Sequence, residues 1–301
     1  MPHIRMTMPV ELPEPETIDV PALLQSCLTG ETEMICVLGP TASGKTKFAV
    51  QLARKMNVIL LEASRGDGAT AEAFPGRVNA FASVVAPSTL PDSQVEIISA
   101  DSRQVYVGMD IGSGKDLEEY GGIPVHLVDI APAGSKYNVY RYQQDFARVY
   151  ADIRQRGGIP LLCGGTGLYI EAAACGYDFG KDQPTVDPAL LPSRTYFIGT
   201  LVSREERNAR IDARLRERLS NGLVEEVKGL LDSGIPAEDL IYYGLEYKYV
   251  TQYVMGILSY EEMFTLLSNA IHQFAKRQMT WFRGMERDGR RIRWILPDSG
   301  I

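Results

Sequence analysis

The chain has 301 residues, of which 45% are hydrophobic and 23% charged, and its formal net charge is −7. This composition is typical of a soluble globular protein, and the length allows one large α/β domain or one domain with an appendage. It disfavours a membrane protein, because no apolar run approaches the roughly 20 residues that a spanning helix needs. The negative charge disfavours a protein that coats nucleic acid with its whole surface.

The N-terminus is acidic and dotted with prolines, and it lacks the basic start and apolar stretch of a secretory signal. We therefore expect a cytoplasmic protein. The cysteines, Cys27, Cys36, Cys163 and Cys175, show no paired zinc-type spacing. We expect them to be reduced and buried rather than metal ligands.

The first part of the chain predicts a strand, a glycine loop and a helix in succession. Residues 1–33 are expected to form a peripheral leader with a short helix over 20–28. Residues 34–38 read MICVL, which is typical of a buried parallel strand. Apolar residues at helical spacing then predict a helix over 45–56.

The middle part alternates strands with helices. Residues 62–94 are rich in Gly, Ala, Ser and Pro, and we expect them to be an inserted loop. Short apolar runs predict further strands at 95–99, 125–130, 159–163 and 195–199, and an amphipathic pattern predicts a helix over 139–156. Residues 34–200 would then form one α/β core.

The last part is predominantly helical. The apolar spacing predicts helices over 204–220, 224–232, 245–255 and 260–285, followed by a strand at 292–296. Ser259 and Glu262 have the spacing of a capping box for the last of these helices. The predicted fold class is a P-loop three-layer α/β/α fold with a parallel sheet, and residues 201–301 would form a helical part packed on the core.

A phosphate-binding motif follows the first strand. Residues 39–46 read GPTASGKT and match GxxxxGK[ST] in full. The glycines allow consecutive backbone N–H groups to point into one cavity, the lysine neutralises an outer phosphate, and the threonine hydroxyl suits Mg²⁺. The predicted diphosphate-binding residues are Gly39, Thr41, Ala42, Ser43, Gly44, Lys45 and Thr46. The loop alone does not distinguish nucleotide hydrolysis, kinase chemistry and the departure of a diphosphate.

Two further segments lie where a parallel sheet places its ligands. Asp101 follows the predicted strand 95–99 and could be a metal ligand, a general base or a helix N-cap. Residues 164–167 read GGTG after another predicted strand. They could form a tight turn, or they could offer amides and the hydroxyl of Thr166 to the phosphates.

A basic segment lies near the C-terminus. Residues 271–294 contain Lys276, Arg277, Arg283, Arg287, Arg290, Arg291 and Arg293 against only Glu286 and Asp288. Such a run is either a solvated helix face or a surface for an anionic partner, a nucleotide or an RNA backbone.

Four motifs in the same order resemble the tRNA dimethylallyltransferase family, also called isopentenyltransferases or IPP transferases. They are GPTASGKT at 39–46, ISADSRQVYVGMDIG at 98–112, GGTGLYI at 164–170 and AKRQMTWFRG at 275–284. Adenylate isopentenyltransferases share the P-loop and the general plan. The resemblance implies that the P-loop binds the diphosphate of dimethylallyl diphosphate together with Mg²⁺.

The resemblance also implies individual roles. Asp101 would be the general base toward the N6 amine of adenine, and Thr166 would help to hold the metal, as would Thr46. The family's RIxxR segment would supply Arg210, rather than Arg214, to the diphosphate as a further catalytic group. The predicted acceptor-binding residues are Ser102, Arg103, Gln104, Lys276, Arg277 and Gln278. For Gln104 a surface-loop position is the alternative.

Three departures from the family pattern fall on the acceptor side. The helical insertion that follows GGTGLYI in the tRNA enzymes is missing before the strand at 195–199, and the segment 62–94 is additional. The family's GYKE element reads LEYKY at 245–249, and its Thr-Arg before AKRQ reads Ile271-His272. The acceptor would be either tRNA, gripped differently, or a free adenine nucleotide such as AMP.

The leading hypothesis is transfer of a dimethylallyl group to N6 of an adenosine in tRNA. An adenylate isopentenyltransferase is the alternative within the class, and a P-loop kinase or a non-catalytic P-loop protein lie outside it. Trp281, Phe282 and His126 are interpreted as core residues rather than functional ones.

Overall fold

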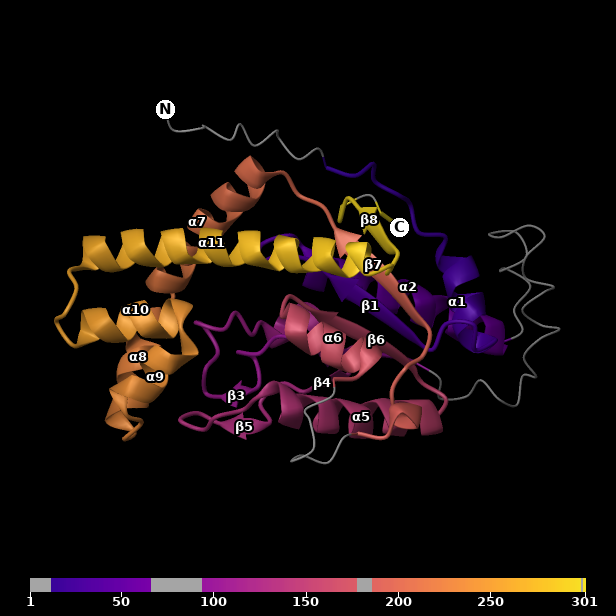
Figure 1. Cartoon of the computed structure of the whole chain (residues 1–301), viewed down its shortest axis with the longest axis horizontal. Helices are drawn as coiled ribbons and strands as arrows, with labels where there is room; N and C mark the ends of the chain where they lie inside the picture. Colours follow the sequence, from indigo (N-terminus) through magenta and orange to yellow (C-terminus); the bar gives the residue numbers. More distant parts are fainter. Residues whose placement is uncertain (1–11, 66–93, 178–185, 299) are drawn as a thin grey trace.

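The computed structural model describes residues 12–65, 94–177, 186–298 and 300–301. Of the predicted inserted loop, residues 66–93 lie outside the described residues. Figure 1 shows a central sheet covered by helices on both faces, with a group of helices beyond one end of the sheet.

The central sheet has the strand order β4-β2-β6-β1-β7-β8, and every pairing in it is parallel. Its strands are β1 (Met34–Leu38), β2 (Val95–Ser99), β4 (Val125–His126), β6 (Ile159–Gly164), β7 (Thr195–Thr200) and β8 (Ile292–Ile295). Leu38 pairs in register with Gly164 and with Gly199, and Ser99 pairs with Cys163. The carboxyl ends of four strands therefore meet at one edge of the sheet, where parallel sheets bind ligands.

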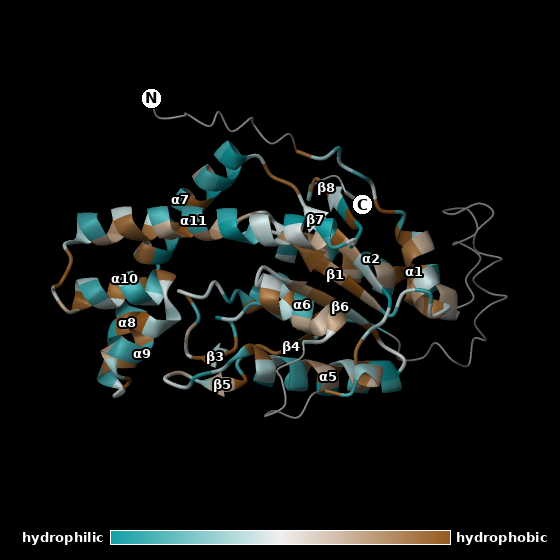
Figure 2. Ribbon diagram, viewed as in Figure 1, coloured by the Kyte–Doolittle hydropathy of each residue, from teal (hydrophilic) through white to brown (hydrophobic). Residues whose placement is uncertain are grey.

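Helices cover the two faces of the sheet as the hydrophobic pattern predicts. On one face, α2 (Lys45–Arg65) packs on alternate side chains of β1 and β2, and α1 (Val20–Leu28) packs against α2. On the other face lie α5 (Val139–Gln155), α6 (Gly167–Cys175) and α11 (Tyr260–Arg287). Figure 2 shows the strands as hydrophobic and the outer helix faces as hydrophilic. The predicted three-layer P-loop fold is confirmed.

A helical lobe extends from one end of the sheet. It contains α7 (Arg204–Ser220), α8 (Leu223–Asp232), α9 (Ala237–Tyr243) and α10 (Leu245–Val254). The capping box of Ser259 and Glu262 is present at the start of α11. The sequence analysis missed α9, because its seven residues are too few to display a helical period.

A loop of the core is bonded to this lobe. The short strands β3 (Tyr106–Val107) and β5 (Ala131–Pro132) form a separate parallel pair. Between them, the carboxylate of Glu226 on α8 accepts the backbone N–H groups of Asp110, Ile111 and Gly112 at 2.8, 2.6 and 3.0 Å. These bonds fix the loop after β3 to the helical lobe.

Two predicted elements differ from the structure. The helix α2 continues to Arg65, so the predicted inserted loop does not begin at 62, because Ile59 and Leu60 extend the buried face. The predicted strand 125–130 is only two residues long, since Leu127 and Asp129 have φ of 61° and 55°. Positive φ is incompatible with a strand.

The N-terminal segment is not a peripheral leader in the region that the structure describes. Leu23, Leu24 and Cys27 of α1 are buried against α2. The backbone N–H of Ile18 donates to the carbonyl of Gly300 at 2.9 Å. This segment therefore belongs to the core, because its apolar side chains share one buried cluster with those of α2.

Some smaller predictions are also settled by burial. The cysteines are free, and all but Cys175, which is exposed, are buried. Phe282 is buried as predicted, whereas Trp281 is 41% exposed and is not a core residue. His126 is bonded to the buried carboxylate of Glu96 at 2.7 Å, which confirms its structural interpretation.

Within the described part of the chain, no helix is long and apolar enough to cross a membrane.

Candidate active site

The P-loop lies between β1 and α2 and curls back on itself. Ala42 and Gly44 have φ of 62° and 82°, the left-handed conformation that turns successive amides toward one side. The hydroxyl of Thr200 donates to Ser43 Oγ at 2.6 Å, which anchors the loop to the end of β7. The loop then opens into the first turn of α2, whose positive dipole end favours an anion.

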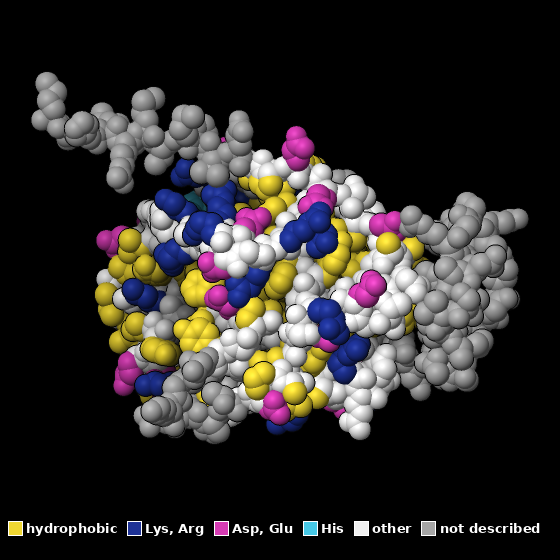
Figure 3. Space-filling model, turned by 45° about the vertical axis from the view of Figure 1, so that its right-hand side comes forward, with side chains coloured by type: hydrophobic (Ala, Val, Ile, Leu, Met, Phe, Trp, Pro, Cys, Tyr) yellow, Lys and Arg dark blue, Asp and Glu magenta, His cyan; other side chains and the backbone are white. Residues whose placement is uncertain are grey.

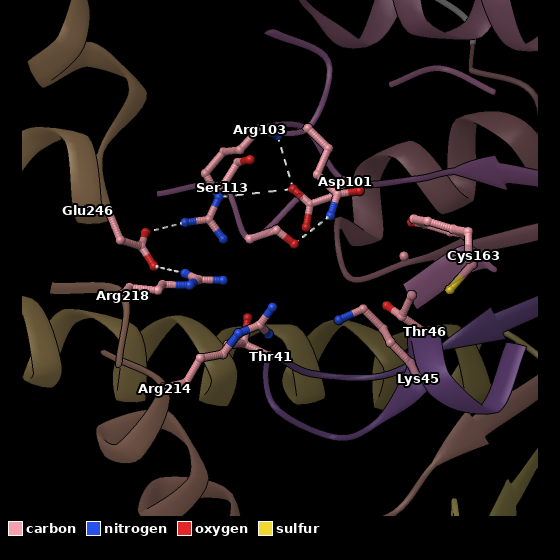
Figure 4. A pocket seen from close by; sticks show the side chains of 14 residues that line it. Thr41, Lys45, Thr46, Asp101, Arg103, Ser113, Cys163, Arg214, Arg218 and Glu246 are labelled. Carbon is pink, nitrogen blue, oxygen red and sulfur yellow. Dashed lines mark hydrogen bonds and ion pairs between the residues drawn. The ribbon is translucent and has the colours of Figure 1, made fainter. Parts of the chain in front are cut away.

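A small pocket lies in front of this loop, and residues from distant parts of the chain line it (Figure 4). Lys45 and Thr46 come from the P-loop, and Asp101 comes from the segment after β2. From the helical lobe come Arg214 and Arg218 of α7 and Glu246 of α10. The lining residues are Thr41, Lys45, Thr46, Asp101, Arg103, Gln104, Ser113, Gly114, Tyr120, Cys163, Gly164, Arg214, Arg218 and Glu246.

Local hydrogen bonds hold the Asp101 segment in one conformation. The backbone N–H of Arg103 donates to Asp101 Oδ1 at 3.0 Å, and Ser99 Oγ accepts the N–H of Asp101 at 3.3 Å. Ser99 Oγ also donates to Gln104 Oε1 at 2.9 Å. The carboxylate is thus bound by its own loop and lies in the pocket opposite the P-loop lysine (Figure 4).

The pocket is strongly cationic. Glu246 accepts bonds from Arg103 at 2.6 Å and from Arg218 at 2.9 Å, whereas Lys45 and Arg214 have no ion pair with any described residue. Both point into the space in front of the P-loop (Figure 4). Burial lowers the pKa of the Lys45 amine, and the charge of Asp101 opposes this shift. Two cations therefore remain for an anionic ligand.

Cys163 is the one thiol of the described residues that lines this pocket. Its burial raises its pKa to about 12, although the Lys45 charge and the Thr46 hydroxyl oppose the shift. The neutral thiol is a poor nucleophile and a poor metal ligand. It contributes packing under the P-loop instead.

The arginine predicted for the diphosphate is not the one that lines the pocket. Arg210 pairs with Glu206 at 2.6 Å and has its guanidinium beside Gly44 of the P-loop, whereas Arg214 and Arg218 line the pocket itself. The three arginines are spaced four residues apart, so they share one side of α7 at successive depths. In the sequence, the repeat of arginine at this spacing indicates all three residues, but only the packing of α7 decides which of them line the pocket.

Thr166 makes a structural contact, and its role in holding the metal stays a prediction. Its hydroxyl accepts the backbone N–H of Ser102 at 3.1 Å and lies 3.3 Å from Ser102 Oγ. Thr166 is not among the residues that line the pocket. It positions the segment after β2 relative to the start of α6.

The predicted acceptor residues separate into three groups. Gln104 lines the pocket at the P-loop, and Ser102, Arg103 and Arg277 line a second cavity described below. Lys276 is exposed on α11 and lines neither. Gln278 is 6% exposed.

The side chain of Gln278 connects the P-loop to the loop that follows β6. Its Oε1 accepts the backbone N–H of Thr41 at 2.8 Å, and its Nε2 donates to the carbonyl of Gly165 at 2.8 Å. Its amide is therefore occupied by backbone, and its position contradicts a direct role in acceptor binding. A buried glutamine at this place satisfies one donor and one acceptor that would otherwise be unpaired.

The second cavity has a volume of about 550 Å³ and lies between the Asp101 segment, α10 and α11. Tyr243, Tyr249 and Phe274 give it aromatic walls, and Lys248 gives it a further positive charge. The guanidinium groups of Arg103 and Arg277 lie 5.4 and 5.8 Å from the centre of the Phe274 ring. Arg103 lines both cavities, so it forms part of the wall between them.

The donor atoms of the first pocket suit Mg²⁺ held mainly through a ligand's phosphates. Mg²⁺ typically binds one or two carboxylates, substrate phosphates and water. Thr46 and Asp101 supply one hydroxyl and one carboxylate in the pocket. Among the described residues there is no group of three or more His, Cys, Asp or Glu side chains that could hold a metal by itself.

The fold and the pocket define an α/β P-loop protein with a cationic cradle facing a carboxylate. The model of the IPP transferase family matches residues 104–192 and 181–285. The tRNA dimethylallyltransferase 2 of Porphyromonas gingivalis is 44% identical over 87% of this chain and 93% of its own length. The tRNA dimethylallyltransferase 2 of Bacteroides fragilis is 41% identical over 87% of this chain. The chain therefore belongs to the IPP transferase family.

Solved structures agree. The tRNA isopentenylpyrophosphate transferase of Bacillus halodurans superposes with a TM-score of 0.67, at 25% identity, over 88% of this chain and 89% of that one. The corresponding enzyme of Staphylococcus epidermidis gives 0.63 at 26% identity, over 88% of this chain and 93% of its own. A eukaryotic dimethylallyltransferase acting on tRNA, 19% identical, shares the fold with a TM-score of 0.62.

The comparisons also bear on the missing insertion. The alignment with the P. gingivalis protein has 318 positions, which exceeds the 301 residues of this chain. The relative therefore has residues without a counterpart here. The two stretches that match the family model overlap at residues 181–192, within the segment where the helical insertion is expected. The absence of the insertion itself stays a prediction.

Proposed function

We propose that this protein transfers a dimethylallyl group from dimethylallyl diphosphate to N6 of an adenosine in tRNA. The observation that carries the proposal is the placement of Lys45 and Asp101 in one pocket of a chain that belongs to the IPP transferase family. A diphosphate on the P-loop would leave the prenyl carbon between the phosphates and a carboxylate. The relatives named above are tRNA enzymes, and this supports tRNA over a free adenine nucleotide.

The chemistry requires a bound leaving group and an oriented amine. The bond from N6 to the allylic carbon forms while the bond from that carbon to the diphosphate oxygen breaks, and the diphosphate leaves with the electron pair. The N6 proton goes to the carboxylate of Asp101, so the amine does not keep a full positive charge. Lys45 and Arg214 would neutralise the departing diphosphate.

Mg²⁺ would be held by the diphosphate and the Thr46 hydroxyl, and it would supply further charge stabilisation to the leaving group. The P-loop amides and the first turn of α2 would hold the same phosphates. Thr41 is an exception, because its N–H already donates to Gln278.

We propose that the cavity between α10 and α11 admits the acceptor. Its aromatic walls suit a stacked base, and Lys248 and Arg277 suit the neighbouring phosphates. Figure 3 shows Lys and Arg side chains gathered toward the side of the molecule where α7 and α11 lie. The protein's net charge is negative, so this local concentration is what would attract RNA.

The direct experiment incubates the full chain with labelled dimethylallyl diphosphate and Mg²⁺, in separate reactions with tRNA, with AMP and with neither. We expect label in tRNA, in an adenosine that carries one added five-carbon unit. Label in AMP alone would identify an adenylate enzyme. Consumption of ATP with a phosphorylated product would instead indicate a kinase and refute the prenyl transfer.

The general base is tested by Asp101→Asn. Because a positioned base contributes roughly 10²- to 10⁴-fold, we expect the turnover of the variant to fall by about this factor. The dissociation constant for pyrophosphate should not rise, since Lys45 and Arg214 remain and the pocket loses a negative charge. An unchanged turnover would exclude Asp101 as the base and favour a protein that only binds the diphosphate.

A further inference from the structure

A buried glutamate from the helical lobe forms ion pairs with two of the basic side chains that line the P-loop pocket. The side chain of Glu246 is 3% exposed, and it lies in the first turn of α10. One carboxylate oxygen accepts from Arg103 at 2.6 Å and the other from Arg218 at 2.9 Å. The two arginines are themselves only 12% and 14% exposed.

Without this carboxylate the two guanidinium groups would have other partners within reach. Arg103 Nε lies 4.0 Å from Asp101 Oδ1, and Arg218 also donates to the carbonyl of Gly112 at 3.2 Å. Burial and the neighbouring Arg214 charge lower the pKa of Arg218 to about 10, a shift that Glu246 opposes. Buried like charges are costly unless each is paired.

We propose that Glu246 is a positioning residue that sets the charge of the diphosphate pocket. It pairs with Arg103 at 2.6 Å and with Arg218 at 2.9 Å, and thereby keeps the contact between the Arg103 guanidinium and Asp101 long, at 4.0 Å. Lys45 and Arg214 are left as the cations that take the diphosphate. This inference rests on the proposed function for its effect on turnover, but not for its effect on pyrophosphate binding.

Glu246 also relates the two cavities. Its partner Arg103 lines both of them, and its neighbour Leu245 lines the larger one. A displacement of α10 by an acceptor would therefore act on the carboxylate that holds Arg103. The ion triad links the acceptor side of the molecule to the base at the donor side.

The test compares wild-type protein with Glu246→Gln. Removing one buried negative charge near a polyanion should tighten pyrophosphate binding by roughly fivefold or more. Turnover should fall by roughly tenfold, because Arg103 is then free to shorten its 4.0 Å contact with Asp101. If Glu246 had a merely structural role, Glu246→Gln would lower both the affinity for pyrophosphate and the turnover. Glu246→Asp, which keeps the charge, should restore pyrophosphate affinity to within about threefold of wild type.

Two matched controls separate charge from packing. Glu225→Gln removes an exposed glutamate on α8 and should leave both quantities unchanged. Glu226→Gln disturbs the loop after β3 and should lower stability without tightening pyrophosphate binding. If Glu246→Gln does not fold, the same charge is removed in an Arg218→Gln background, where the pocket loses a cation as well. The double variant should then bind pyrophosphate more tightly than Arg218→Gln alone.

Weaker or unchanged pyrophosphate binding on removal of Glu246, in whichever background folds, would overturn the inference. Tighter binding in a protein that transfers no prenyl group would support the role of Glu246 in the pocket's charge and refute the proposed function alone.

Discussion

At the scale of single residues, the site depends on which charges are paired and which are not. Lys45 and Arg214 face the P-loop pocket without an ion pair among the described residues, whereas Arg210 is paired with Glu206. Neither the net charge nor the number of arginines on α7 distinguishes Arg214 from Arg210. The two arginines differ in their position along the helix, and therefore in the groups that each side chain reaches.

The two arginines therefore predict different losses. Arg214→Gln should weaken pyrophosphate binding roughly tenfold to a hundredfold, because a bond to a charged group contributes about 1.5–3 kcal/mol. Arg210→Gln should weaken binding less than Arg214→Gln, because Arg210 lies beside the P-loop but is already paired with Glu206. Calorimetric titration of the two variants under identical conditions measures both. A larger loss for Arg210→Gln would restore the assignment made from the sequence.

The lowered pKa of Lys45 predicts a dependence on pH. Pyrophosphate binding favours the protonated amine, so affinity should fall as the pH rises through the pKa of Lys45 in the free protein. Since burial lowers that pKa, the fall should begin below the value of about 10.4 of an ordinary lysine. In Lys45→Arg the side chain stays protonated, so the ratio of the two affinities, measured from pH 7 to 10, removes the titration of the ligand itself. A ratio that does not change with pH would contradict the prediction.

At the scale of elements, the long helix α11 supports the P-loop through the side chain of Gln278. Gln278 pairs with Thr41 N–H and with the carbonyl of Gly165, which belong to two different loops. The residue thus connects the loop after β1 to the loop after β6. Its motif, AKRQ, is part of the family pattern, but here its glutamine stabilises the phosphate loops rather than touching an acceptor.

Gln278→Leu should destabilise the protein and weaken the site. The substitution leaves a buried donor and a buried acceptor unpaired, each at a cost of about 1–3 kcal/mol. Denaturant unfolding measures the loss, and Gln273→Leu, an exposed position on the same helix, should change the free energy of unfolding by less than about 0.5 kcal/mol. Equal stabilities of the two variants would show that the P-loop does not depend on this contact.

At the scale of the whole molecule, both ends of the chain complete the core. The helix α1 covers α2, and β8 pairs with β7 at the edge of the sheet. The N–H of Glu16 donates to the carbonyl of Trp294 at 2.6 Å, which joins the two ends directly. The boundaries 1–33, 34–200 and 201–301 therefore do not correspond to independent units.

Leu24→Ala tests this view of the N-terminal segment. Leu24 is fully buried, and truncation of a buried leucine typically costs about 2–5 kcal/mol. Val58→Ala at the exposed side of α2 should cost less than about 1 kcal/mol. The free energies of unfolding of both variants decide the point, and a Leu24→Ala protein as stable as wild type would make the segment a dispensable leader after all.

The sequence by itself determined the elements whose signals are local. The strand, glycine loop and helix around Gly44 were predicted, since glycine freedom and hydrophobic period act over a few residues. The position of Asp101 beside the P-loop also followed, because parallel strands end at a common edge.

Only the tertiary structure decided which side chains share a cavity. Arg214 rather than Arg210 lines the pocket, Gln278 is buried beneath the P-loop, and Glu246 reaches two arginines from distant segments. Helical spacing restricts each of these residues to one side of its helix but leaves the neighbour on that side unspecified. The neighbour is set by how the helices pack, and that packing depends on burial summed over the whole chain.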